Sequence, residues 1–325
     1  MKPVSILLAG TALAAFTSTA ALAEKWDMPL AYPAGNFHSQ NAEAFATCVK
    51  EGTGGELEIV THPGGSLFGG NDIKRAVQTG QAPIGERLIS AHANENPLFG
   101  IDSIPFLASS YEASAKLWAA AEADVEKALA DQNLVYVYGV PWPPQGLYTK
   151  KEVNSVADLA GVKFRAYNAA TARIAELAGM APVQIEAAEL SQALATGVAE
   201  SFISSGSTGV DSKVWESLTH FYDVQAWLPR NLVFVNKDAW DALDDATRQA
   251  ISDCGDKAGA DGAKLSEELT AGYLKTLEEN GMTVSKPGDT LRGELTGFGE
   301  TMTNEWVSNA GDTGKAIIDA YKKGM

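Results

Sequence analysis

The chain contains the stretch Leu159-Ala160-Gly161-Val162-Lys163-Phe164-Arg165-Ala166-Tyr167-Asn168, which predicts a short strand and the start of a helix. The helix that follows ends at Gly179, because a residue without Cβ suits a helix end. Arg165 therefore lies at the carboxyl end of a strand, where open α/β sheets bind their ligands. An arginine there can hold a carboxylate through two parallel N–H···O bonds. By spacing alone, a surface arginine in a salt bridge is the commoner arrangement, so both readings stay open at this point.

Outside this stretch, short apolar runs alternate with helical patterns along most of the chain. Further strands are predicted at residues 57–60, 135–138, 182–185 and 232–235. Amphipathic helical segments separate these strands. Alternating βα units of this kind predict an α/β fold in which helices cover the sheets.

The last third of the chain has a different pattern. From Asp245 to about Asn280 it is helical almost without interruption, despite Gly255, Gly259 and Gly262. A helix of ~35 residues is ~50 Å long, which exceeds the width of one domain. We therefore expect this helix to bridge two domains. No disordered linker is apparent, so crossing strands rather than a tether are expected to join the domains.

Charge narrows the classes of partner. The 325 residues include 25 Lys plus Arg and 41 Asp plus Glu, which gives a formal net charge of −16. Such an acidic surface repels phosphate backbones, so nucleic-acid binding is not expected. The sequence has no basic amphipathic stretch of the kind that binds an anionic membrane surface. Length and charge favour a protein that handles small molecules.

The first 23 residues predict a secretory signal peptide. Lys2 provides the positive end, an apolar core follows, and Ala21-Leu22-Ala23 is a cleavage site of the small-x-small type. No later segment approaches 18 consecutive apolar residues, so stable membrane insertion is not expected. We expect an exported protein in the periplasm of a Gram-negative bacterium.

The chain contains few residues suited to metal or catalytic chemistry. Cys48 and Cys254 could form a disulfide after export or remain buried thiols, and the sequence leaves both readings open. The four histidines show no zinc-ligand spacing. No dinucleotide-binding motif, P-loop or nucleophile elbow occurs, and the glycine-rich run 64–70 lacks the P-loop lysine. We expect no metal, no cofactor and no enzymatic activity.

Four motifs give the sequence a family resemblance. In chain order they are His62-Pro63-Gly64-Gly65-Ser66-Leu67-Phe68-Gly69-Gly70, Asp102-Ser103-Ile104-Pro105-Phe106-Leu107, Gly161-Val162-Lys163-Phe164-Arg165 and Ala193-Leu194-Ala195-Thr196-Gly197-Val198-Ala199-Glu200. They resemble motifs of the DctP-like substrate-binding proteins of tripartite ATP-independent periplasmic (TRAP) transporters. In the last motif, Glu200 replaces the family's aspartate. The resemblance covers nearly the whole chain after residue 23.

The resemblance implies a two-domain periplasmic binding protein of the Venus-flytrap type, with crossing hinge strands and a long bridging helix. We expect domain I to comprise residues 24–147 and about 233–285, and domain II residues 148–232 and about 286–325. The C-terminal helices should pack across both domains. The expected partners are a small organic anion and the small and large integral-membrane permease subunits, and the protein should be a monomer.

On this resemblance, Arg165 takes the position of the arginine that binds the substrate carboxylate. The family's second arginine falls on Gln145, and its carboxylate-binding asparagine falls on Ser204, which Ser205 follows. A pocket phenylalanine falls on Ala187 and a neighbouring tyrosine on Ser191, so the pocket should be wider. Because a buried unpaired charge is costly, we expect a monocarboxylate with a larger apolar or aromatic body, such as an aromatic, 2-oxo or 2-hydroxy acid. The alternative within the family is a C4-dicarboxylate.

Five further residues are candidates for the ligand site. Trp142 lies between prolines at the hinge crossing and Trp227 precedes a strand that re-enters the first domain. Glu86 lies at a strand end of domain I, where the resemblance implies a polar contact. Tyr32 and Asn36 follow the first strand, in a loop that faces the ligand in the family. Each of these residues could equally have a structural role.

Two other classes of function compete with transport. An exported enzyme would need a base or nucleophile near Arg165, and the sequence offers only serines without a neighbouring histidine. A sensor ectodomain would present the ligand to a signalling partner, and neighbouring genes for a kinase or regulator would indicate it. Both are weaker readings than a binding protein, and the enzyme is the weakest.

Overall fold

The computed structural model describes residues 23–324. The predicted signal peptide, apart from Ala23, lies outside the described residues. Two sheets of domain I adjoin one another, because Leu30 at the end of β1 bridges to Glu86 of β3. The first is the parallel pair β1–β2, and the second has the antiparallel order β3-β10-β4. The strands of domain I are β1 (Glu24–Pro29), β2 (Leu57–His62), β3 (Ile84–Leu88), β4 (Leu134–Pro141) and β10 (Arg230–Asn236).

Helices cover the sheets of domain I. Asn36 starts the first helix by accepting a hydrogen bond from the His38 backbone N–H through its side chain (2.9 Å), which satisfies a helix-end donor. The helices are α1 (Phe37–Gly52), α2 (Gly70–Gln78), α3 (Tyr111–Ala130) and α7 (Lys237–Ala242), with the 3₁₀ turns η1 (Ile89–His92) and η2 (Pro97–Ser103).

Domain II is built on one six-stranded mixed sheet of order β11-β9-β5-β8-β6-β7. Its strands are β5 (Gly146–Thr149), β6 (Lys163–Ala166), β7 (Ala181–Gln184), β8 (Ser201–Ser204), β9 (His220–Tyr222) and β11 (Thr283–Ser285). Strands β7, β6 and β8 run parallel, so their carboxyl ends meet at one edge. The helices are α4 (Ala169–Leu177), α5 (Leu190–Ala195) and α6 (Gly206–Asp211), with the turns η3 (Val156–Leu159), η4 (Ala187–Glu189) and η5 (Val214–Glu216).

Two crossing segments join the domains, as the sequence predicted. One runs from β4 to β5 through residues 142–145, and the other from β9 to β10 through residues 223–229. They are hydrogen-bonded to each other: the Trp142 N–H donates to the Pro229 carbonyl (2.7 Å), and the Gln145 N–H donates to the Trp227 carbonyl (3.0 Å). The hinge is therefore a paired ribbon rather than two independent linkers.

Sheet pairing groups some strands differently from the sequence-based domain boundaries. That division placed residues 146–147 and 283–285 in domain I, whereas β5 and β11 belong to the sheet of domain II. The physical reason is hydrogen bonding, because β5 pairs with β8 and β9, and β11 pairs with β9. Strand β10 starts at Arg230, inside the range that the sequence gave to domain II, and pairs with β3 and β4. The boundaries themselves stay a prediction.

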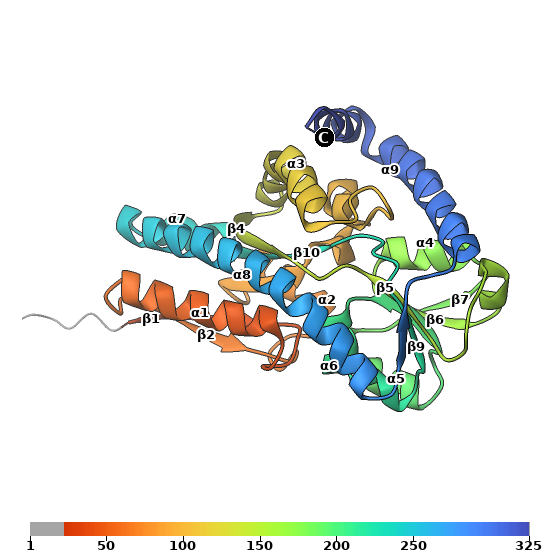
Figure 1. The fold of residues 1–325 in the computed structure, drawn as a ribbon. Coiled ribbons are helices and arrows are strands. Elements are labelled where there is room, and N and C mark those ends of the chain that lie inside the picture. The colour runs from red at the N-terminus through yellow and green to blue at the C-terminus, as the bar shows by residue number, and fades with distance from the viewer. Residues whose placement is uncertain (1–22, 325) are drawn as a thin grey trace, which may run out of the picture.

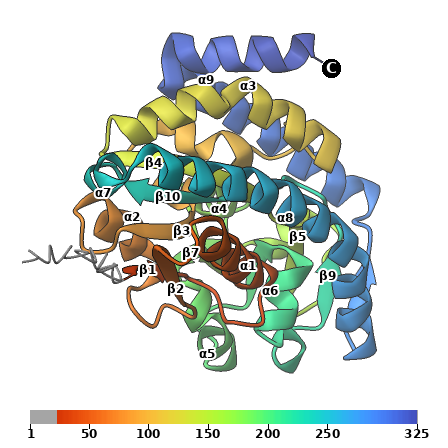
Figure 2. The ribbon, with the colours of Figure 1, turned by 90° about the vertical axis from the view of Figure 1, so that its left-hand side faces the viewer.

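Two long helices cross from one domain to the other. Helix α8 (Asp245–Glu279) packs on α1 and β4 in domain I and reaches α6 and β11 in domain II (Figures 1 and 2). Helix α9 (Asp289–Lys323) contacts α4 in domain II and α3 in domain I, and bends at Gly311. The predicted bridging helix is confirmed, and α9 is a second one. The glycines inside α8 allow close approach to β4: a Cβ at Gly255 would meet a methyl of Val137 at 2.7 Å.

A disulfide links α1 to α8. Cys48 and Cys254 are bonded across 206 residues of sequence, which settles the question that the sequence left open. Among residues 23–324, no helix is long and apolar enough to cross a membrane.

Candidate ligand-binding site

A cavity of about 40 Å³ lies between the two domains. Domain I supplies Tyr32 and Arg87, domain II supplies Arg165 and Glu186, and the hinge supplies Gln145. Space of this kind holds one water in about 10–15 Å³, so the cavity fits one small molecule. The lining residues are Tyr32, Arg87, Leu88, Trp142, Gln145, Arg165, Tyr167, Gln184, Ile185, Glu186, Ala187, Ser204, Thr208 and Pro229.

Arg165 lies on β6 and is 3% exposed. Its Nε donates to the backbone carbonyl of Ile185 (2.9 Å), and its guanidinium lies 4.9 Å from the ring centre of Tyr167. Among the described residues, no carboxylate pairs with this guanidinium. Burial lowers the pKa of Arg165 to about 10, so the side chain remains charged at neutral pH. A buried cation without a partner is costly, and an anionic ligand would neutralise it.

Gln145 is fixed at the hinge by both ends of its side chain. Its Nε2 donates to the Pro143 carbonyl (2.9 Å), and its Oε1 accepts from the Tyr167 hydroxyl (3.1 Å). Tyr167 in turn lies under the Arg165 guanidinium. Burial raises the pKa of Tyr167, so its hydroxyl stays protonated and able to donate. These contacts orient Arg165 toward the cavity.

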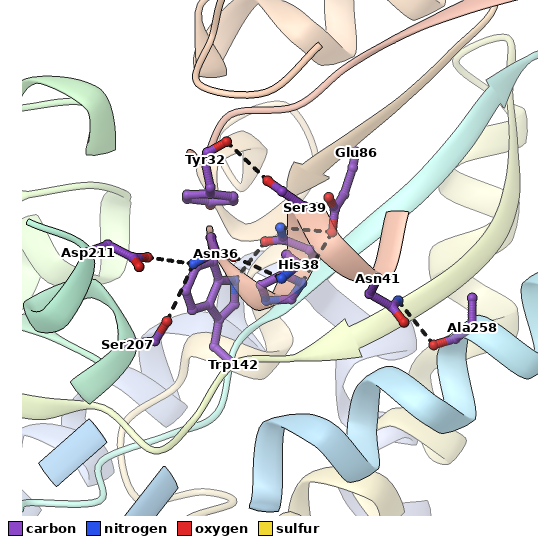
Figure 3. Close-up of polar contacts among 11 residues, drawn as sticks. Tyr32, Asn36, His38, Ser39, Asn41, Glu86, Trp142, Ser207, Asp211 and Ala258 are labelled. Carbon is purple, nitrogen blue, oxygen red and sulfur yellow. Dashed lines mark hydrogen bonds and ion pairs between the residues drawn. The ribbon is translucent and has the colours of Figure 1, made fainter. Parts of the chain in front are cut away.

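Tyr32 and Trp142 form an aromatic wall. Their rings meet edge to face at 4.7 Å between centres, an arrangement that aromatic quadrupoles favour. The Trp142 indole N–H donates to Asn231 Oδ1 (2.7 Å), and the His38 ring lies 4.3 Å behind the indole (Figure 3). The wall is therefore held from the side that faces away from the cavity.

Glu86 and Asn36 lie next to this wall but do not line the cavity. Glu86 is 2% exposed and its Oε1 accepts from Asn231 Nδ2 (3.2 Å) and lies 3.2 Å from His38 Nδ1, so it supports the residue that holds Trp142. Asn36 donates from Nδ2 to Asp211 Oδ2 of domain II (2.6 Å; Figure 3). Asn36 is thus a contact between the domains.

Ser204 lines the cavity, whereas Ser205 lies behind it. The Ser204 hydroxyl donates to Thr208 Oγ1 (2.9 Å). Ser205 caps α6, because its Oγ accepts from the Thr208 backbone N–H (3.3 Å). Helix α6 therefore begins next to the cavity.

Trp227 is 1% exposed and lines a different, smaller apolar cavity, together with Phe106, Ile174 and Phe298. Its contribution to the ligand cavity is indirect, since its backbone carbonyl holds the Gln145 N–H. The structure therefore brings together Tyr32, Trp142, Gln145, Arg165 and Ser204, and places Asn36, Glu86, Ser205 and Trp227 around them.

A second arginine, Arg87 of β3, enters the cavity from domain I and is 4% exposed. Its Nη2 donates to Asn71 Oδ1 (2.6 Å) and lies 3.5 Å from Glu186 Oε2 of domain II. Gly70 leaves the room for this pair, because a Cβ there would lie 2.7 Å from both Arg87 Nη1 and Glu186 Oε2. The pair spans the gap between the two domains.

The charged side chains that line the cavity add up to one positive charge. Arg87 and Arg165 are cations and Glu186 is the only carboxylate among the lining residues. Glu186 offsets one arginine by pairing with Arg87. The excess of one cation matches a ligand that carries one negative charge.

Residues 31–306 match the model of the family described as bacterial extracellular solute-binding protein, family 7, also called DctP. The chain belongs to this family. A TRAP solute-binding protein specific for pyroglutamate, from a marine metagenome (unidentified microbe), is 59% identical, with 93% of this chain and 99% of that chain covered and a TM-score of 0.92. Its structure contains co-purified pyroglutamate. DctP6 of Bordetella pertussis, an extracytoplasmic solute receptor that binds pyroglutamic acid, is 48% identical over 92% of this chain and 100% of that chain, with a TM-score of 0.91.

A curated relative matches over a shorter range. A monocarboxylate 2-oxoacid-binding periplasmic protein of Nostoc sp. is 28% identical over 144 residues, which cover 43% of this chain and 40% of the relative. The chain thus spans less than half of the length of that relative. The predicted TRAP solute-binding family and the two-domain α/β fold are confirmed, and membership in a family of solute-binding proteins confirms that the chain is not an enzyme.

Sequence reasoning missed Arg87, Tyr167, Glu186 and Thr208 in this solute-binding protein. Tyr167 had a usable signal, since it follows Arg165 by two residues and so shares its side of the strand. Glu186 follows β7, a parallel neighbour of β6, so the strand-end rule that selected Arg165 applies to it as well. Arg87 had no such signal in the sequence. All five residues of β3 are buried, so the alternation of side chains along the strand does not say which face borders the cavity.

Proposed function

We propose that this solute-binding protein captures pyroglutamate, or a cyclic monocarboxylate of the same size, and delivers it to a TRAP-type secondary transporter. The observation that carries the proposal is Arg165, a buried guanidinium that lines the cavity with no carboxylate partner among the described residues. A ligand carboxylate would supply that partner through two parallel hydrogen bonds.

The charge of the cavity supports a monocarboxylate over a C4-dicarboxylate. Only one of the two arginines lacks a carboxylate, since Glu186 already faces Arg87. A second carboxylate on the ligand would meet Glu186 and be repelled by it. Relatives of known structure that are 59% and 48% identical are described as binding pyroglutamate, which has a single carboxylate.

The size of the cavity supports a compact ligand. The loss of side-chain volume at Ala187 led us to expect a wide pocket and a larger apolar or aromatic body. The cavity is about 40 Å³, and Arg87 and Tyr32 of domain I and Trp142 of the hinge line it together with Ala187. The cavity therefore supports an acid with a single small ring, and pyroglutamate has that size.

The partners and the location follow from the family and from the predicted leader. We propose that the chain is exported through a cleaved signal peptide, resides as a monomer in the periplasm of a Gram-negative bacterium and docks on the small and large permease subunits. The match to extracellular solute-binding proteins supports an extracytoplasmic location.

Native mass spectrometry of the protein as purified is the first test, followed by a thermal-shift screen after the bound ligand is removed by unfolding and refolding. The screen includes pyroglutamate, pyruvate, benzoate, succinate and malate. At 100 times Kd, a ligand that binds only the folded state adds ~2.7 kcal/mol to the free energy of unfolding. We expect pyroglutamate to raise the melting temperature most. A screen in which only succinate and malate raise it contradicts the proposal.

A further inference from the structure

Two buried polar atoms beside the cavity have no hydrogen-bond partner. They are Nε of Arg87 and Oε1 of Glu186, and both residues line the cavity. One other polar atom of each side chain is engaged, since Arg87 Nη2 contacts Asn71 Oδ1 and Glu186 Oε2. A buried donor or acceptor without a partner costs free energy, so each is expected to meet a ligand atom.

We propose that Arg87 and Glu186 form an amide-recognition pair opposite the carboxylate site at Arg165. Arg87 donates from Nε to the carbonyl oxygen of the ligand amide, and Glu186 Oε1 accepts from its N–H. This inference rests on the proposed function, because it assigns the part of a small monocarboxylate that lies away from Arg165. It defines the ligand class as a compact carboxylate that carries a secondary amide, of which a lactam is the smallest cyclic form.

The chemistry of the pair selects an amide over other groups. The secondary amide of a lactam is cis and presents its acceptor and its donor on the same side, which matches one donor and one acceptor on neighbouring side chains. A ketone or an ester would leave Glu186 Oε1 without a donor. A carboxylate would place like charges together, which disfavours both charged forms.

The pair also depends on the closed arrangement of the domains. Asn71 fixes Arg87 within domain I, whereas Glu186 follows β7 in domain II. The 3.5 Å contact between Arg87 Nη2 and Glu186 Oε2 therefore exists only when the domains meet. An amide held by both side chains would join the domains through the ligand.

Three small ligands distinguish the contribution of the carboxylate site at Arg165 from that of the amide pair of Arg87 and Glu186. The probes are L-pyroglutamate, its lactone analogue in which oxygen replaces the ring N–H, and cyclopentanecarboxylate, which has the carboxylate alone. Calorimetric titration of the ligand-free wild type should give at least about tenfold weaker binding of the lactone than of pyroglutamate, the loss expected when a hydrogen bond to a charged acceptor is removed. Cyclopentanecarboxylate should bind more weakly still.

The variant Glu186→Gln tests whether Glu186 accepts the hydrogen bond from the lactam N–H. A glutamine amide can turn to accept from the lactam N–H or to donate to the lactone oxygen, so the preference for pyroglutamate should fall below about threefold. Glu216→Gln is the matched control, because Glu216 is an exposed glutamate of domain II away from the cavity. It should keep the full preference, and circular dichroism verifies that both variants fold.

The outcomes distinguish this inference from the proposed function. Equal binding of pyroglutamate and lactone by the wild type overturns the amide pair and leaves carboxylate binding intact, and this comparison needs no variant. An undiminished preference in folded Glu186→Gln also overturns it. If the wild type rejects pyroglutamate but binds the six-membered lactam 6-oxopiperidine-2-carboxylate and not the corresponding lactone, the proposed ligand is wrong and the amide pair stands. Binding of none of these probes overturns both.

Discussion

The two arginines of the cavity come from opposite domains and differ in their surroundings. Arg165 of domain II makes one hydrogen bond to a backbone carbonyl and forms no ion pair with a carboxylate of the described residues. Arg87 of domain I is held by Asn71 and faces Glu186. Burial is nearly the same for both, at 3% and 4% exposed. On this comparison we propose that the charge of Arg165 is left for the ligand, whereas Glu186 already offsets that of Arg87.

Removal of Arg165 should have the largest effect on binding. Truncating one partner of a desolvated, hydrogen-bonded charge pair typically costs ~2–5 kcal/mol, which is roughly thirty-fold to several thousand-fold in Kd. Arg165→Ala should weaken pyroglutamate binding by at least the lower figure in calorimetric titration. Arg165→Lys should also weaken binding, since an ammonium keeps the charge but not the planar fork.

Folding controls decide how this result is read. Arg165 lies at a strand end beside the cavity, so both variants should give the far-ultraviolet circular dichroism of the wild type. If folded Arg165→Ala binds pyroglutamate within a factor of about three of the wild type, the difference between the two arginines is not functional.

Removal of Arg87 should have a smaller effect that a second change partly reverses. Arg87→Met removes the donor to the ligand carbonyl and leaves the Glu186 carboxylate without its cation, and we expect a loss of at least about tenfold in affinity. Arg87→Met combined with Glu186→Leu removes both charges and restores a cavity with one cation. Because removing both partners of a buried pair costs less than removing one, the double variant should bind more tightly than Arg87→Met. Additive losses in this double-mutant cycle would show that the two side chains act independently.

Sequence reasoning predicted the fold and part of the lining of the candidate site. Repeated βα units and the uninterrupted pattern from Asp245 predicted two domains and a bridging helix, because periodicity reports which face of an element is buried. Arg165 was found because its strand end and its family motif agree. The contacts of Arg87 and Glu186 form only where two domains meet, some 100 residues apart in the chain, and no local pattern encodes that approach. The cavity volume depends on the same meeting, so Ala187 alone could not predict it.

Removal of the Glu186 charge should relax the discrimination against dicarboxylates. With Glu186→Gln the lining residues would carry two positive charges and no carboxylate, so a second ligand carboxylate would gain a partner. We expect succinate to bind about tenfold more tightly to this variant than to the wild type in a competition titration. Glu216→Gln changes the net charge equally and should leave succinate binding unchanged. An equal gain in both variants would attribute the effect to the overall field of the protein.

Ligand binding should also bring the two domains closer together. The domains are joined by a paired hinge and contact each other through Asn36–Asp211 and Arg87–Glu186. Small-angle scattering should give a radius of gyration smaller by on the order of 1 Å with saturating pyroglutamate, as hinge closure in periplasmic binding proteins implies. If the ligand-free protein is open and its radius of gyration does not change at saturating pyroglutamate, the result would contradict domain closure.

A crystal structure of the protein with bound pyroglutamate tests the central claim most directly, because it locates each end of the ligand. We predict both carboxylate oxygens within hydrogen-bond distance of the Arg165 guanidinium, with the lactam carbonyl at Arg87 and the lactam N–H at Glu186. A ligand whose carboxylate lies on Arg87, with Arg165 contacting only protein, would contradict the account.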